Sequence, residues 1–166
     1  ETPAYVYSQY FLGRRATALA RIDLLNKLSQ NFDVTVYTHA DCKDILPTAI
    51  YGGKIDYYDT MPTVFQHSKI NLNITLKTIQ TGIPLRAWDI LGCGGFLLTN
   101  FQQELCDFFI PGEDFVYYES PADAIEKAAY FLSHDRERQE IAHNAFEKIA
   151  ASHTFHHRVQ SMFDII

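Results

Sequence analysis

Short apolar runs alternate with helical patterns along the chain, and this alternation constrains the fold more than any other feature of the sequence. The runs are rich in β-branched and aromatic residues, which favour strands. Strands separated by helices pair in parallel, because a parallel pair needs a crossover connection and a helix supplies it. We therefore predict an α/β fold, a single Rossmann-like domain with a mainly parallel sheet flanked by helices and a helical segment at the C-terminus.

Glycine, proline and capping residues set the expected boundaries of these elements. Gly13 is expected to separate a first strand from a helix, and Ser120 followed by Pro121 predicts a later helix start. The expected strands are residues 4–10, 33–39, 54–58, 70–75, 96–99 and 115–118. The expected helices are residues 14–30, a short stretch after Pro62, 84–92, 104–109, 121–133, 136–152 and 155–165.

Length and composition narrow the class of protein. The 166 residues form one domain, since domains average roughly 100–200 residues. A formal charge of −6 disfavours nucleic acid as a partner. No apolar run reaches the roughly 20 residues that cross a bilayer, so no integral membrane segment is expected. The three cysteines lack metal-binding or disulfide spacing, and a cytoplasmic location is expected.

The first residue is Glu1 and not methionine, which favours a domain taken from a larger protein. Residues 1–166 are therefore interpreted as one Rossmann-like domain of a longer chain. In such domains ligands bind beyond the carboxyl ends of the strands, next to helix N-termini. The loops to inspect are accordingly residues 11–15, 76–86 and 100–104, which follow three of the expected strands.

The second of these loops is the most distinctive. Gly82 allows close approach of a ligand to the backbone, and Pro84 suits the first turn of a helix. Asp89 lies about a turn and a half inside that helix. Its carboxylate, which only accepts hydrogen bonds, could bind two neighbouring hydroxyls of a ribose.

Two alternatives remain open for the arginines near these loops. Arg86 lies three residues before Asp89 and so shares its helix face, where it could contact a phosphate or pair with Asp89. Such pairs contribute only about 0.2–0.5 kcal/mol. Arg14 and Arg15 follow Gly13 at an expected strand-to-helix turn, where they could contact a diphosphate or be solvated side chains. Cations at a helix N-terminus are unfavourable unless an anion is present.

Several motifs between Pro62 and Arg158 resemble one family. They are Ser68-Lys69-Ile70-Asn71-Leu72-Asn73, Arg86-Ala87-Trp88-Asp89, Gly92-Cys93-Gly94-Gly95-Phe96-Leu97-Leu98, and His153-Thr154-Phe155 with Arg158. This region resembles the nucleotide-sugar-binding C-terminal domain of GT-B glycosyltransferases, in the group-1-like branch that includes spore-maturation-type proteins.

The resemblance implies roles for particular residues. Asp89 would hold the donor's ribose, and the helix-start segment Gly82-Ile83-Pro84-Leu85 would bind the phosphates through its backbone N–H groups, which Pro84 lacks, together with Arg86. Related retaining enzymes carry a glutamate eight residues before this acid, but here that position is Thr81. Recognition of the donor sugar is therefore unassigned, and the catalytic residue is unknown.

The same resemblance implies a substrate and a partner. The substrate would be a nucleoside-diphosphate sugar, with no further cofactor, and an N-terminal domain of the same protein would bind the acceptor. The sequence contains no Asp-x-Asp motif, which agrees with transfer without a metal. Preoriented N–H dipoles and a cation can stabilise a departing diphosphate. The alternative, which Thr81 favours, is a non-catalytic nucleotide-binding or protein-interaction module derived from a glycosyltransferase.

Other candidate groups have simpler interpretations. His153, His156 and His157 lack a partner acid or thiol at ligand spacing, so no metal site is expected. Cys93 is expected to be a small buried thiol and not a nucleophile. The pairs Tyr57-Tyr58 and Tyr117-Tyr118 are expected to alternate between strand faces, with one ring at a strand end as a weaker candidate for stacking on a nucleobase.

Overall fold

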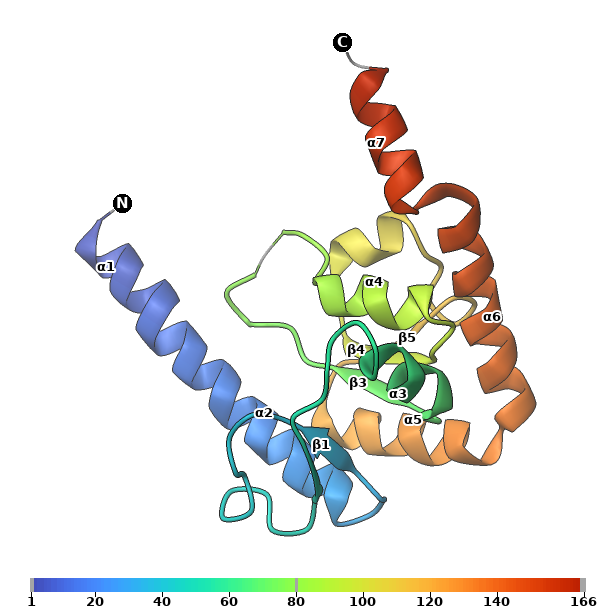
Figure 1. Cartoon of the computed structure of the whole chain (residues 1–166). Coiled ribbons are helices and arrows are strands. Elements are labelled where there is room, and N and C mark those ends of the chain that lie inside the picture. The colour runs from blue at the N-terminus through green and yellow to red at the C-terminus, as the bar shows by residue number, and fades with distance from the viewer. Residues whose placement is uncertain (1, 80, 165–166) are drawn as a thin grey trace.

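The chain begins with a long continuous helix, and the strand predicted at residues 4–10 is wrong. The computed structural model describes residues 2–79 and 81–164, and Figure 1 shows this helix running along one side of the molecule. It comprises α1 (Pro3–Val6), the π-helical η1 (Tyr7–Gly13) and α2 (Arg14–Ser29). Gly13 lies inside it with helical dihedral angles, φ −64° and ψ −42°.

Two local features explain the helix. The Thr2 hydroxyl caps its start by accepting a hydrogen bond from the Tyr5 backbone N–H at 3.2 Å, and Pro3 occupies the first helical position. The aromatic residues that follow are strand formers only where a sheet buries them. Here they are exposed, with Phe11 at 62% of its full accessibility, so nothing favours a strand.

All strand pairs of the described residues are parallel, which confirms that part of the prediction, but they form two small sheets and not one. The first sheet pairs β1 (Thr35–Tyr37) with β2 (Ile50–Gly53). The second has the order β3-β4-β5 and contains β3 (Asn71–Asn73), β4 (Leu97–Asn100) and β5 (Val116–Tyr118). The strand predicted at residues 54–58 is misplaced, since β2 ends at Gly53, whose φ of 74° breaks the extended backbone.

The remaining helices lie close to their predicted positions. They are α3 (Met61–His67), α4 (Leu85–Gly92), the 3-10 helix η2 (Gln103–Asp107), α5 (Pro121–Ser133), α6 (Asp135–Ser152) and α7 (Phe155–Phe163). The Ser120 hydroxyl caps α5 as expected, accepting the Asp123 backbone N–H at 3.2 Å. The predicted end of the last helix at residue 165 lies outside the described residues.

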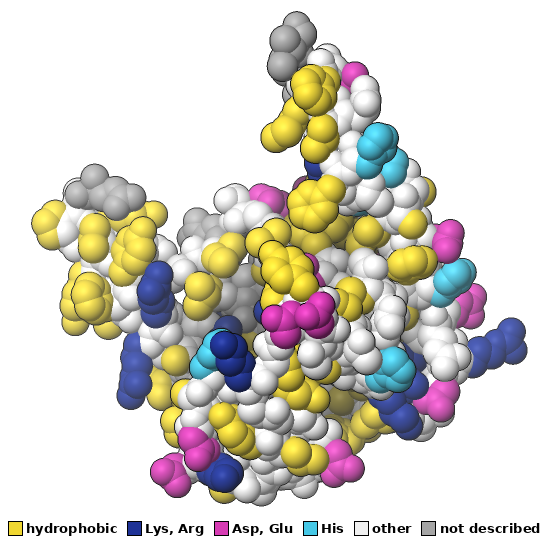
Figure 2. All heavy atoms as spheres, in the orientation of Figure 1, with side chains coloured by type: hydrophobic (Ala, Val, Ile, Leu, Met, Phe, Trp, Pro, Cys, Tyr) yellow, Lys and Arg dark blue, Asp and Glu magenta, His cyan; other side chains and the backbone are white. Residues whose placement is uncertain are grey.

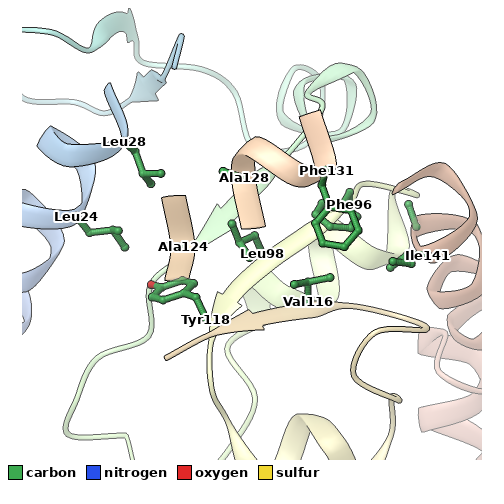
Figure 3. Packing of buried hydrophobic residues seen from close by; sticks show 11 residues of the cluster. Leu24, Leu28, Phe96, Leu98, Val116, Tyr118, Ala124, Ala128, Phe131 and Ile141 are labelled. Carbon is green, nitrogen blue, oxygen red and sulfur yellow. The ribbon is translucent and has the colours of Figure 1, made fainter. Parts of the chain in front are cut away.

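The three-stranded sheet is covered on both faces, so the fold is α/β and Rossmann-like. Leu97 and Leu98 are successive residues of β4 and point to opposite faces, and both are buried. Leu98 packs with Leu24 of α2 and with residues of β5 and α5 (Figure 3). Leu97 packs on the other face with residues of α3 and α4.

Both ends of the described chain carry exposed apolar side chains. Figure 2 shows hydrophobic side chains gathered on the projecting N-terminal helix and on the C-terminal one. On the α1–η1 helix the exposed residues are Tyr5, Tyr7, Tyr10, Phe11 and Leu12. On α7 they are Phe155, Val159, Met162 and Phe163, and Phe155 is 92% exposed. None of the helices that the structure describes has the length and apolar character to span a bilayer.

One ridge of α2 holds the loop that follows β3. The Thr17 hydroxyl, only 2% exposed as a residue, accepts the Lys77 backbone N–H at 3.0 Å and donates to the Gly13 carbonyl at 2.8 Å. One turn further along, the Arg21 guanidinium donates to the Ile74 carbonyl at 2.9 Å. The spacing of four residues places these groups on one helix face.

Gly13 lies one turn before Thr17 on the same helix face, and its lack of a side chain lets the loop approach closely. A Cβ at this position would lie 2.0 Å from Cγ2 of Thr78, closer than two carbon atoms can approach. The glycine therefore lets the loop after β3 pack against the helix backbone. This loop leads toward α4, which packs against α3, α6 and the strands β3 and β4.

Replacing Thr17 by valine should lower the free energy of unfolding by about 1–3 kcal/mol, because the Lys77 N–H then loses its acceptor. Thr17→Ser keeps the hydroxyl and should retain most of the stability. Urea denaturation followed by circular dichroism measures both. Equal stability of the two variants would show that this contact does not anchor the loop.

Candidate functional site

The start of α4 lies one residue later than predicted. Pro84 is the N-cap, with φ −58° and ψ 136°, and Leu85 is the first helical residue. Pro84 brings no N–H and no side-chain cap bond, and the first N–H groups of any helix lack acceptors within the helix. Gly82, with φ 98°, turns the backbone just before this start. The segment therefore presents backbone donors, as an anion site requires.

One of these donors already binds a carboxylate. The Gly82 backbone N–H donates to Oε2 of Glu104, a residue of η2 on the loop after β4. Sequence reasoning selected this loop as one of three to inspect but did not select Glu104. The signal that could have found it is an acid just beyond the carboxyl end of a strand next to β3.

Asp89 is half-buried and accepts a hydrogen bond from a hydroxyl. The Tyr57 hydroxyl donates to Oδ2 of Asp89 at 2.7 Å, across 32 residues of sequence. This hydrogen bond, with some burial, raises the pKa of Tyr57 above its usual value. Tyr58 packs edge-on against Tyr57, with ring centroids 5.1 Å apart, and is 83% exposed. Neither tyrosine lies in a strand, so the predicted alternation between strand faces is wrong for this pair.

Arg86 faces the gap between the two sheets. Its guanidinium donates to Sδ of Met61 and lies over the ring of Phe65, 5.4 Å from the centroid, and over that of Tyr57 at 5.9 Å. Among the described residues no ion pair joins Arg86 to Asp89, so the helix salt bridge considered from the sequence is wrong.

A cavity of about 1470 Å³ lies beside Arg86. It separates the two sheets, with β1 and β3 on its borders and α2 residues along one side. Arg21 of α2 and Arg86 of α4 are both among the residues that line it. Asn73 also lines it and is held by the hydroxyls of Thr75 and Thr99, at 3.1 Å and 3.0 Å.

The structure gives less support to the other residues that were predicted for the site. Arg14 and Arg15 are exposed and lie inside the long helix, not at a strand-to-helix turn, so the helix-start argument for them and for Gly13 is wrong. Arg14 lies over the ring of Tyr10, 5.4 Å from its centroid. The remaining members of the loop are Thr81, which is exposed, Ile83, which packs against the core, and Leu85, which is 77% exposed.

Next to Asp89, Trp88 attaches the last helix to α4. Its ring lies 5.3 Å from the ring of His153, and the Arg158 guanidinium of α7 lies 5.7 Å from the Trp88 centroid. Arg158 Nη2 is 2.8 Å from Nδ1 of His153, so the arginine donates and a neutral histidine accepts. Burial, then Arg158 and His157, lower the pKa of His153.

A comparison with known protein families places the chain in one of them. Residues 15–164 match a family described as glycosyl transferase-like. The chain belongs to this glycosyl transferase-like family. The match runs from the start of α2 into the last residues described, so it includes Arg86, Asp89 and Glu104. No curated protein matches the chain. Glycosyltransferase membership is thus confirmed, and the GT-B branch remains a prediction.

No metal-binding cluster of histidine, cysteine or acidic residues occurs within residues 2–79 and 81–164. His153 is instead paired with Arg158, and His157 caps α7 together with Thr154. The thiols of Cys42, Cys93 and Cys106 are free. Cys93 is half-buried at the end of α4, and burial raises its pKa, which disfavours the thiolate that a nucleophile needs.

Acidification should weaken the attachment of α7. Because the pKa of His153 is lowered below 6.5 in the folded protein, the unfolded chain binds this proton more tightly. The free energy of unfolding should therefore fall as the pH drops through 6.5 and below, with no cost above it. Denaturation series between pH 8 and pH 5 measure this dependence.

His153→Asn provides the comparison, since its amide oxygen can still accept from Arg158 but does not titrate. The stability of this variant should depend less on pH than that of the wild type. His143→Asn, at an exposed position of α6, is the matched control. A pH dependence unchanged in His153→Asn would contradict the assignment.

Proposed function

We propose that the chain is the donor-binding domain of a GT-B-type glycosyltransferase and binds a nucleoside-diphosphate sugar for transfer to an acceptor. One observation carries the proposal beyond family membership: the half-buried Asp89 carboxylate accepts a hydrogen bond from a hydroxyl at 2.7 Å. A ribose offers hydroxyls of the same chemistry. An ionised carboxylate has two oxygens and several lone pairs, so it can accept from two neighbouring hydroxyls.

The diphosphate would bind at the start of α4. Backbone N–H groups between Gly82 and Leu85 face an anion there, and the positive end of the helix dipole favours it. Arg86 would supply a cation. As the sugar leaves, negative charge grows on the diphosphate, and preoriented donors can stabilise this charge without a metal. The absence of an Asp-x-Asp motif from the sequence supports that part of the proposal.

An acceptor-binding domain of the same protein would complete the enzyme. The exposed apolar residues of the α1–η1 helix and of α7 support such a partner, because exposed apolar patches mark interaction surfaces. A cytoplasmic setting, which the free thiols support, is part of the same proposal.

A second candidate function is a nucleotide-binding or protein-interaction module without turnover. Thr81 favours it, because the threonine stands where related retaining enzymes have the glutamate that reaches the donor sugar. One measurement distinguishes the two candidate functions. It is made on the full-length protein with donor and acceptor supplied. Release of the nucleoside diphosphate supports the enzyme, and binding without release supports the module.

Asp89→Ala should weaken binding of a nucleoside diphosphate by more than about 1 kcal/mol and leave the fold intact, because the carboxylate bonds to ligand hydroxyls and lies outside the buried core. Calorimetric titration with UDP, GDP and ADP measures the affinity, and a thermal melt checks the fold.

The matched control is Asp23→Ala, which removes an exposed helical aspartate paired only with Lys27. Its affinity should equal that of the wild type. An unchanged dissociation constant in Asp89→Ala would remove Asp89 from the site. Failure of the wild type to bind any of the three nucleotides would overturn the proposed function itself.

A further inference from the structure

Two protein groups occupy the atoms that the proposed function assigns to the donor. The Glu104 carboxylate lies on the Gly82 N–H, and the Tyr57 hydroxyl lies on Oδ2 of Asp89. We propose that Glu104 and Tyr57 are internal competitors of the nucleotide, which displaces them from the Gly82 N–H and from Oδ2 of Asp89 as it binds. This inference rests on the proposed function.

The two competitors match the two ends of the expected ligand. A carboxylate, like a phosphate, is an anion that only accepts hydrogen bonds, so Glu104 stands in for a phosphate oxygen. A phenol donates through its hydroxyl, so Tyr57 stands in for a ribose hydroxyl. Both contacts are made by residues of distant loops, 22 residues from Gly82 and 32 from Asp89.

Neither competitor is held in the core, so displacement does not require the fold to open. Tyr57 is 42% exposed and Glu104 is half-buried. The backbone beside each is fixed independently. Oδ1 of Asp56 accepts the N–H groups of Tyr58 and Asp59, both at 2.8 Å, while Leu105 anchors η2 in the core. The proposed displacement therefore involves the two side chains and leaves the backbone beside them in place.

Competition of this kind lowers the apparent affinity for ligand. When a site is available only part of the time, its apparent dissociation constant equals the intrinsic dissociation constant divided by the available fraction. Glu104 competes through charge and so opposes phosphates only. Tyr57 competes for the acid at the ribose position and so opposes any ligand that carries the sugar hydroxyls.

Two variants separate these contributions. Glu104→Gln removes the charge and should tighten binding of a nucleoside diphosphate by about tenfold, the effect expected from losing a competing charge-assisted hydrogen bond. Its affinity for the uncharged nucleoside should not change. Tyr57→Phe removes the hydroxyl and should tighten binding of nucleoside and diphosphate alike, by severalfold. Calorimetric titration with UDP, GDP, ADP and the three parent nucleosides measures both.

Two control variants make the same chemical changes, loss of a tyrosine hydroxyl and loss of a glutamate charge, at positions outside the site. Tyr130→Phe removes a tyrosine hydroxyl that donates to Glu137 at 2.8 Å, away from α4. Glu126→Gln neutralises an exposed glutamate of α5. Both should bind nucleotide as the wild type does. A thermal melt confirms that all four variants are folded.

The outcomes distinguish this inference from the proposed function. Wild-type binding with no gain, or a loss, in Glu104→Gln and Tyr57→Phe would overturn the competition and leave the function in place. Binding that becomes measurable only in the two variants would support both. Absence of binding in the wild type and every variant would overturn the proposed function and the competition with it.

Discussion

The attachment of the loop after β3 to α2 is the interaction on which the candidate site depends. The buried Thr17 hydroxyl and the Arg21 guanidinium hold backbone groups of this loop, and Gly13 leaves room for Thr78. The loop then runs to the start of α4, which bears Arg86 and Asp89. At the far end of the loop, Gly82 is held by Glu104, and Ile83 packs against the core. The long N-terminal helix therefore helps to fix the loop that leaves the three-stranded sheet after β3.

The site is built from groups whose hydrogen bonds are satisfied by other parts of the chain. Gly82 donates to Glu104, Asp89 accepts from Tyr57, and Arg86 contacts sulfur and aromatic rings. Glu104 and Tyr57 have the chemistry of a phosphate oxygen and of a ribose hydroxyl, respectively.

Elements with strong local signals were predictable from the sequence, and contacts between distant loops were not. Pro84 and Ser120 mark helix starts within one residue, because capping depends on neighbouring residues. The helix at residues 3–13 was predicted as a strand because its residues include several aromatic ones. Aromatic residues favour a strand only where a sheet buries them, and no sheet covers these residues. Glu104 and Tyr57 reach the site through tertiary contacts across 22 and 32 residues, and only the position of Glu104 just after a strand gave a signal in the sequence.

The division of the strands between two sheets has a further effect on the molecule. In the part of the chain that the structure describes, β1 pairs with β2 and β3 pairs with β4, so β1 and β3 each keep one open edge on the same cavity. Open edges are templates for additional strands. Within the described residues the two sheets do not pair with each other, so Arg21 and Arg86 line an open space and not a closed core. Solvent in an open space screens charge, which weakens the attraction of both guanidinium groups for an anion compared with that of a dry interior.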